Sequence, residues 1–321
     1  MEMNSNTVGM ILLAIFQIPS FCCAMLIFLQ LLDKTNPLRR LQNHLLVYLL
    51  IFATCTIIIE LPNTQKFLWS GFATIQTDWF CHFWNFLFFS MASLNRLLTA
   101  LLSIERHMLV FHPHLYRTHR SRYLFHYTPL ISIIAISIIY MLLTNLFITC
   151  SNHSFNYSVF MCGFPCSVIV QYFGTLYVWL YVFMPTMMTI IACVLLPIRF
   201  IIQKRRFQRM QWYRARKMII QTSVIASAFT ICWLPYTIIL QLLINKRLSI
   251  LHPIINSLLT FTPYVTSLLT PFIVLHTVWE WMKPAIIQHI KHWFFPQRQR
   301  IIQPISNLVP TPANQFIINK A

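Results

Sequence analysis

A charged triplet, Glu105-Arg106-His107, lies at the end of a long apolar segment. A carboxylate beside a guanidinium neutralises it, and its release frees a long donor that can cap the backbone carbonyls of a partner. Arg106 follows Cys81 by 25 residues. Because a helix rises about 1.5 Å per residue, one helix would carry these two residues to opposite faces of a membrane. The triplet therefore predicts a switch at one membrane face.

A second constellation, Phe229, Cys232, Trp233 and Pro235, lies in a later apolar segment. Pro235 removes one backbone hydrogen bond and bends the helix that contains it. Neighbouring helices or water must satisfy the freed carbonyl, so the position can act as a hinge. Trp233 is expected to point its bulk toward the helix bundle. It either packs there as an ordinary aromatic residue or takes part in the hinge.

The composition places these residues in a membrane. Hydrophobic residues make up 57% of the 321 residues and charged residues only 9%, whereas soluble domains have about 25% charged residues. Six acidic residues are too few for chemistry that needs clustered carboxylates. Apolar runs long enough to cross about 30 Å of hydrocarbon occur seven times. We predict an all-α seven-transmembrane helix bundle with spans near residues 8–32, 41–62, 79–104, 127–149, 171–202, 218–244 and 251–278.

The basic residues orient these spans. The net charge of +18 comes mainly from short blocks between alternate spans and from the end of the chain, as in cytoplasmic loops. We therefore expect residues 1–7 outside the cell and the C-terminus inside, in a multi-pass protein of the plasma membrane. The membrane domain would cover residues 8–295. It would end in a short amphipathic helix lying in the membrane interface, followed by a flexible tail over residues 296–321.

Cysteines and sequons agree with this orientation. Cys81, Cys150, Cys162 and Cys166 fall on the predicted outer side, where disulfides persist. Four cysteines allow three pairings. Two glycosylation sequons, at Asn152 and Asn156, lie in the same outer loop.

Together these motifs resemble the rhodopsin-like G-protein-coupled receptors across all seven spans. Cys81 is similar to the family's disulfide cysteine, which implies a bond to Cys162 or Cys166. Glu105-Arg106-His107 resembles the family's acidic-Arg-aromatic switch, with His107 in place of Tyr. The resemblance continues in the complete hinge motif of Phe229, Cys232, Trp233 and Pro235, in the helix 5 proline Pro185, and in Trp69-Ser-Gly71 of the first outer loop.

The chain also departs from the family pattern. Ala53 stands where the family carries a sodium-binding Asp, so sodium binding is not expected. Thr270-Pro271-Phe-Ile-Val274 replaces the Asn-Pro-x-x-Tyr motif, and Cys193 replaces the helix 5 Tyr. The Tyr-mediated part of activation must therefore differ.

The resemblance implies a ligand pocket among helices 3, 5, 6 and 7. Phe88 replaces the Asp that pairs with monoamines, and Tyr264 replaces the Lys that binds retinal, so we expect neither ligand. A peptide is favoured over a small apolar molecule, mainly because peptide receptors are common in the family. The matching positions are Asn85, Phe88, Phe89, Ala92, Tyr177, Tyr181, Trp233, Tyr236, Thr260 and Tyr264.

Arg96 is a further unusual residue, ten positions before Arg106. A cation in mid-membrane costs several kcal/mol unless it meets water or acceptors. It either bonds to Asn95 and Thr neighbours around a water cavity or acts as a relay between the pocket and the hinge, because the family's equivalent residue packs against Pro185 and Phe229.

The mechanism implied is a population shift. An agonist favours a state in which the sixth span swings out about Pro235, and Glu105 then releases Arg106 to a heterotrimeric G protein. The basic third inner loop would contact the G protein and anionic membrane lipids. No acid stands at Ala215 to hold Arg106, so the resting lock is expected to be weak.

The main alternative is a polytopic transporter or channel, which would commonly show repeated halves or Gly-interrupted spans. The chain has four glycines and no internal duplication. We expect no enzyme activity, no cofactor, no metal site and no nucleic-acid partner.

Overall fold

The computed structural model describes residues 5–32, 43–148, 155–202, 209–244, 260–276 and 279. The chain divides into two units, Met1–Val278 and Trp279–Ala321. Only Trp279 of the second unit is described, so the predicted interfacial helix and the tail lie outside the described residues. Cys150 and Asn152 lie outside them as well.

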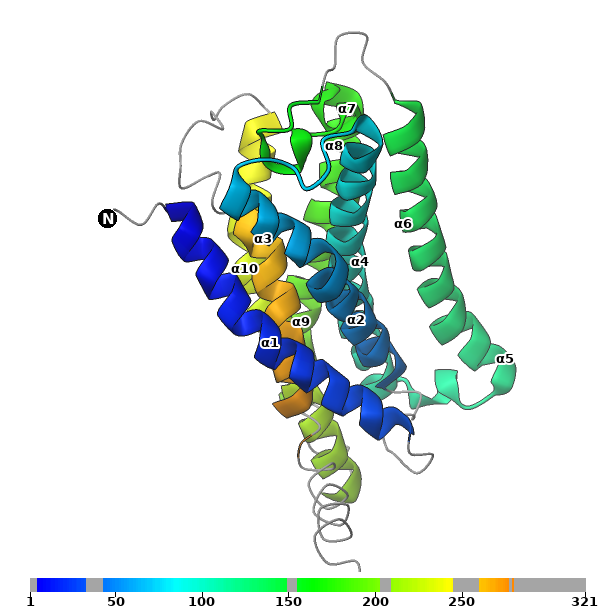
Figure 1. Cartoon of the computed structure of the whole chain (residues 1–321). Helices are drawn as coiled ribbons and strands as arrows, with labels where there is room; N and C mark the ends of the chain where they lie inside the picture. The colour runs from blue at the N-terminus through cyan, green and yellow to red at the C-terminus, as the bar shows by residue number, and fades with distance from the viewer. Residues whose placement is uncertain are drawn as a thin grey trace, which may run out of the picture. The chain divides into compact units, whose positions relative to one another are not determined.

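Long helices account for most of the first unit (Figure 1). Residues 260–276 form a further helix. The labelled elements of the transmembrane spans are α1 (Ser5–Leu32), α2 (His44–Cys55), η3 (Thr56–Glu60), α3 (Leu61–Ser70), α4 (Asp78–Phe111), α5 (His119–Arg122), η5 (Tyr123–Tyr127), α6 (Thr128–Phe147), α8 (Gln171–Tyr177), η7 (Val178–Phe183), α9 (Met184–Ile202) and α10 (Arg209–Ile244). The short helices η4 (Pro113–Tyr116), η6 (Phe160–Cys162) and α7 (Cys166–Ile169) lie in the loops.

Six helical spans of the described residues are long and apolar enough to cross a membrane. They correspond to the first six spans predicted from the sequence, and residues 260–276 lie within the seventh. The all-α class is confirmed. The six spans are Thr7–Leu32, His44–Ser70, Asp78–Phe111, His119–Phe147, Gln171–Ile202 and Met218–Leu243.

Several predicted boundaries were wrong because helices continue through polar residues. The second span reaches Ser70 instead of residue 62, and it ends where Gly71 takes a left-handed φ of 73°. The third span reaches Phe111 instead of residue 104. The fourth begins near His119, where the Thr118 side chain accepts a hydrogen bond from the backbone N–H of Ser121.

The third span, α4, is the central helix of the bundle. It packs against α2, α6, α9 and α10 (Figure 1). In its most apolar stretch 78% of the residues are buried, against 22% for α1. Helix 260–276 is joined to this core by side chains, because Ser20 donates to the Leu268 carbonyl at 2.8 Å and Asn95 donates to Ser267 at 3.4 Å. Polar residues on α4 therefore reach most of the other spans.

Three spans contain a π-helical turn, in which the backbone carries one extra residue. These turns are η3, η5 and η7. Such turns leave carbonyls less regularly paired and often lie at functional sites. Here η3 contains Glu60 and η7 lies directly before Pro185.

The close packing of Gly174 on α8 against Val168 can be tested by substitution. A Cβ atom at this position would lie 2.2 Å from the carbonyl oxygen of Val168. We expect Gly174→Ala to lower the thermal unfolding midpoint, because overpacking costs about 1–3 kcal/mol and outweighs the gain of about 1 kcal/mol in helix propensity. Thr175→Ala on the same helix is the control, and equal midpoints for the two variants would contradict the close contact.

Candidate ligand pocket and activation switch

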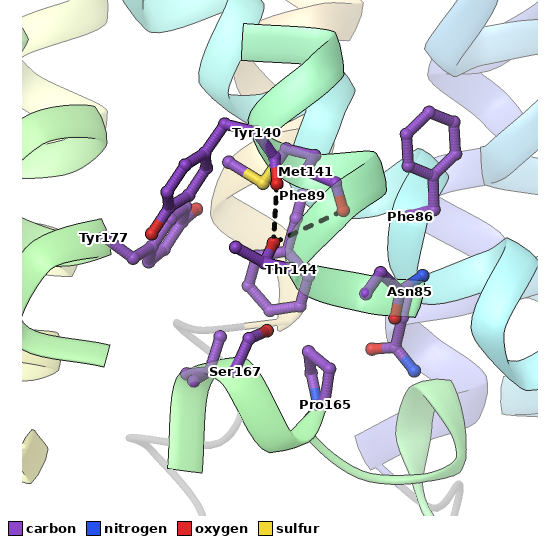
Figure 2. A pocket seen from close by; sticks show the side chains of 11 residues that line it. Asn85, Phe86, Phe89, Tyr140, Met141, Thr144, Pro165, Ser167 and Tyr177 are labelled. Atoms are coloured by element: carbon purple, nitrogen blue, oxygen red, sulfur yellow. Dashed lines mark hydrogen bonds between the residues drawn. The ribbon is translucent and has the colours of Figure 1, made fainter. Parts of the chain in front are cut away.

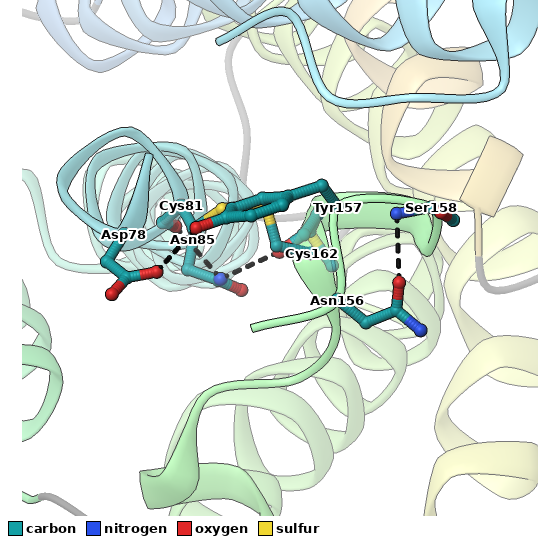
Figure 3. The surroundings of a disulfide bond; sticks show 8 residues. Asp78, Cys81, Asn85, Asn156, Tyr157, Ser158 and Cys162 are labelled. Atoms are coloured by element: carbon teal, nitrogen blue, oxygen red, sulfur yellow. Dashed lines mark hydrogen bonds between the residues drawn. A yellow bond between two sulfur atoms is a disulfide. The ribbon is translucent and has the colours of Figure 1, made fainter. Parts of the chain in front are cut away.

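A disulfide fastens the loop after α6 to the start of α4. Cys81 is bonded to Cys162, with Cα atoms 5.7 Å apart (Figure 3). Of the two pairings that the sequence left open, the one with Cys162 is therefore found. Cys166 is disulfide-bonded as well, so it is not free to compete. We call this the disulfide end of the bundle and the opposite end, with Arg106, the switch end.

Polar contacts hold the same loop from several sides. Asn85 donates to the carbonyls of both Cys81 and Met161, at 3.0 and 2.9 Å. The Tyr157 hydroxyl donates to Asp78 at 2.8 Å, and this hydrogen bond raises the pKa of the hydroxyl (Figure 3). Met161 and Cys162 have φ values of 55° and 59°. Such left-handed residues cost free energy and persist where surrounding contacts enforce them.

An aromatic cluster lies directly beneath this loop. Phe160 lies 5.6–5.9 Å, centroid to centroid, from the rings of Phe67, Trp84 and Phe88. Phe88 in turn contacts Tyr264 at 6.2 Å. The loop thus places a side chain over Phe88 and close to Tyr264, which are both predicted pocket residues.

A cavity at this end lies between α4, α6, α7 and α8 (Figure 2). Its volume is about 20 Å³, room for one or two waters. Of the predicted pocket residues it includes Asn85, Phe89 and Tyr177. This cavity borders α6 and α7 and therefore differs in position from the pocket predicted among helices 3, 5, 6 and 7, which stays a prediction. Ala92 and Thr260 are buried outside the cavity lining.

A buried carboxylate joins three spans near the aromatic cluster. Glu60 in η3 is 1% exposed, and its Oε1 atom accepts hydrogen bonds from Tyr264, from Trp84 at 3.2 Å and from Thr64 at 3.3 Å. Thr64 and Tyr264 also share a hydrogen bond of 2.6 Å. Buried charges are tolerated when donors surround them in this way. The cluster fixes helix 260–276 against α3 and α4.

Arg96 lies in the middle of α4 and is 2% exposed. Its Nε donates to the Tyr181 carbonyl at 2.8 Å, and its Nη2 donates to the hydroxyls of Tyr177 and Ser93 at 3.0 and 3.3 Å. The Tyr181 carbonyl is open to this donor because Pro185, four residues later, has no N–H. The predicted partners were wrong: the acceptors come mainly from α8 and η7 rather than from Asn95 and Thr neighbours.

The same guanidinium reaches the hinge helix. Arg96 Cζ lies 4.3 Å from the ring centroid of Trp233 and 5.9 Å from that of Tyr236. The two rings contact each other at 5.0 Å. A desolvated cation over an aromatic face is stabilised by about 2 kcal/mol. Arg96 therefore connects α4, the fifth span and α10 through a single side chain.

The other hinge residues lie close by. Pro235 is within α10, which continues through it as one helix. Pro185, Phe229 and Trp233 line a second cavity together with Arg96. Cys232 is a partly buried free thiol, and Pro271 is buried in helix 260–276. The structure thus brings together Arg96 and the hinge residues of the fifth and sixth spans.

At the switch end, the charged triplet makes different contacts from those predicted. Glu105 Oε1 lies 2.9 Å from Nδ1 of His126 in η5. Arg106 Nη2 donates to Asn43 at 3.3 Å. Within the described part of the chain, no ion pair under 4.0 Å joins Glu105 to Arg106. The predicted pairing is therefore not found in this conformation, because His126 offers Glu105 a second cation or donor that the sequence did not reveal.

Arg106 is enclosed at this end. It is 1% exposed, and its Nε and Nη1 have no hydrogen-bond partner among the described residues. His107 turns toward α9, where Arg199 Nη1 lies 2.9 Å from its Nε2. An apolar layer then joins α4, α9 and α10 through Val110, Leu196, Phe200 and Ile219. Val110 in this layer lies one helical turn beyond Arg106 on α4.

Sequence reasoning missed four contributors to these sites: Glu60, His126, Phe160 and Asn43. Glu60 had a detectable signal, because it is the only acid of its span. His126 and Asn43 are polar residues near span ends, where such residues are common. Phe160 is one of 27 phenylalanines. Nothing in the sequence distinguished these three.

The Glu60 cluster gives a second test. Tyr264→Phe removes one donor from a buried carboxylate, which should cost about 1.5–3 kcal/mol and lower the thermal unfolding midpoint. In a Glu60→Gln background the same substitution should cost much less. Equal losses in both backgrounds would show that the hydroxyl does not act through Glu60.

Comparison with known proteins identifies the family. A family model described as "7 transmembrane receptor (rhodopsin family)" matches residues 24–273. A search of curated proteins finds no match. The family match runs from α1 into helix 260–276 and contains Cys81, Arg106 and Trp233. Because it spans well over half of the sequence, the chain belongs to the rhodopsin family of seven-transmembrane receptors.

Proposed function

We propose that this receptor carries an extracellular signal across the plasma membrane to a heterotrimeric G protein. In this proposal the disulfide end faces outward and the switch end faces the cytoplasm, as the basic loops indicate. Agonist binding favours a state in which α10 swings outward about Pro235. The observation that carries the proposal is the enclosed Arg106, with two N–H groups lacking partners among the described residues.

The closed switch end supports this mechanism. An outward movement of α10 would separate Ile219 from Val110, Leu196 and Phe200. Arg106 would then reach the opened space with donors available for backbone carbonyls of a partner. No acidic side chain stands at Ala215 to hold Arg106 by charge. Instead, the apolar layer holds the resting state through the burial of its side chains.

The disulfide end supports a ligand that binds mainly at the surface. The cavity described there measures about 20 Å³, far below the 300–1,000 Å³ of drug-sized pockets. An agonist would insert one anchoring side chain that displaces Phe160, while the rest of the agonist contacts the loops. We therefore favour a peptide agonist. A small apolar molecule is the second candidate, because Phe86, Phe89 and Met141 line the cavity.

The outer loop also fits an extracellular position. Asn156 is exposed, and its sequon lies beside the disulfide. Anionic lipids would contact the basic residues at the cytoplasmic side.

Receptor and transporter activity can be separated in one preparation. Purified protein in lipid nanodiscs with G protein would be screened for GTP exchange against a panel of peptides and lipids, and the same protein in vesicles for solute flux. Agonist-driven exchange supports the proposal. Solute flux without exchange would favour the transporter.

Arg106→Gln tests the switch directly. The substitution removes charged donors worth about 1.5–3 kcal/mol, so GTP exchange should fall by about tenfold or more. Arg117→Gln, at an exposed position in the loop after η4, is the matched control. Full exchange by Arg106→Gln at an equal amount of folded receptor would contradict the role of Arg106.

Ile219→Ala tests the apolar layer. Truncating a buried Ile side chain to Ala costs about 2–5 kcal/mol of stability. In the proposed mechanism only the closed conformation contains the apolar layer, so the substitution destabilises that conformation relative to the open one. Basal GTP exchange should rise. The neighbouring Ile220 is 52% exposed, so Ile220→Ala should leave basal exchange near wild type. A similar change in both variants would argue against the layer as a lock.

Arg96→Leu tests the connection between pocket and hinge. The substitution removes the contacts to Tyr181 and Trp233 while retaining an apolar side chain. We expect strongly altered signalling at unchanged surface level, measured by GTP exchange together with surface labelling. Signalling equal to wild type in this variant would show that Arg96 does not act as a relay between the pocket and the hinge.

A further inference from the structure

The cavity next to Trp233 is lined by hydrogen-bond donors and by the buried positive charge of Arg96. Its residues come from α4, α9 and α10, and they are Arg96, Pro185, Thr186, Thr189, Phe229, Thr230 and Trp233. Its volume is about 10 Å³, the lower limit for one water-sized occupant. None of its lining residues belongs to the loop or to the aromatic cluster at the disulfide end.

Three donors at this cavity lack protein partners. Arg96 Nη1, Trp233 Nε1 and Thr230 Oγ1 are buried, and none has a hydrogen-bond partner among the described residues. The Tyr236 hydroxyl interacts with the Arg96 guanidinium through its charge and through a side-chain hydrogen bond, but Nη1 itself has no partner within hydrogen-bond geometry. Thr186 and Thr189 already donate to backbone carbonyls of Val182 and Pro185. A buried donor without an acceptor destabilises the fold, so we expect an acceptor at this cluster.

The charge of Arg96 is also unbalanced. Three carboxylates lie within the described part of the chain, and each has its own partners. Glu60 accepts from Tyr264, Trp84 and Thr64, Asp78 accepts from Tyr157, and Glu105 pairs with His126. None forms an ion pair with Arg96. The carbonyl and the two hydroxyls that accept hydrogen bonds from Arg96 carry no net charge, so they do not balance its positive charge.

We propose that this cavity binds a single monovalent anion of halide size, with chloride as the physiological occupant. The anion accepts hydrogen bonds from Arg96 Nη1 and Thr230 Oγ1, and it supplies the missing negative charge. A water could accept these bonds but would leave the charge unbalanced in a medium where charges are costly. Because the cavity joins α4, α9 and α10, the bound anion stabilises their closed packing around Trp233.

The test uses purified full-length receptor in lipid nanodiscs without G protein, so it does not depend on coupling. Thermal unfolding is measured in potassium chloride, potassium bromide and potassium gluconate at constant ionic strength. Gluconate is too large for the cavity. Chloride and bromide should raise the midpoint saturably, on the order of 5 °C at about 100 times the dissociation constant. Binding of radioactive chloride gives an independent readout.

Variants locate the site. Arg96→Met should abolish the chloride-dependent shift and chloride binding, and Thr230→Val should weaken binding at least about threefold, because one neutral hydrogen bond contributes about 0.5–1.5 kcal/mol. Thr222→Val is the matched control on α10, since its hydroxyl donates to the Met218 carbonyl instead. It should retain the full chloride shift. Equal midpoints in all three salts would overturn the proposal in favour of water, as would unchanged chloride binding by Thr230→Val.

Discussion

A guanidinium in the middle of a membrane helix must find acceptors within the bundle, and much of this receptor is organised around that requirement. Arg96 reaches the carbonyl that Pro185 leaves open, two hydroxyls and the face of Trp233. Its contacts therefore extend from the central helix to the fifth and sixth spans. Any rotation of α10 about Pro235 changes the environment of this charge, so the hinge and the cation are energetically coupled.

The two ends of the bundle are closed by different kinds of interaction. At the disulfide end, Cys81–Cys162 and Asn85 hold Phe160 over the aromatic cluster. At the switch end, apolar burial between α4, α9 and α10 encloses Arg106. In the proposed mechanism, displacing Phe160 would disturb Phe88 and Tyr264, and opening the apolar layer would expose Arg106. Trp233 and Arg96 lie between these two events and can transmit one to the other.

Much of this fold was predictable because membrane spans follow from apolar length alone. The helix ends were less predictable, since α4 continues past Glu105 through polar residues. The Cys81 pairing and the partner of Glu105 needed three-dimensional information, because the sequence offers several cysteines and histidines at similar positions. Arg96 was recognised as unusual, but its partners Tyr177 and Tyr181 lie on another span, and the sequence does not show which face of that span meets α4.

A double-mutant cycle tests the central claim most directly. Basal GTP exchange would be measured for wild type, Arg96→Leu, Trp233→Leu and the double variant, with Arg96→Leu combined with Ile220→Ala as the control pair. A cation over a buried ring predicts a coupling free energy of about 1–2 kcal/mol between Arg96 and Trp233, and additivity for the control. Additive effects of Arg96→Leu and Trp233→Leu would contradict the account.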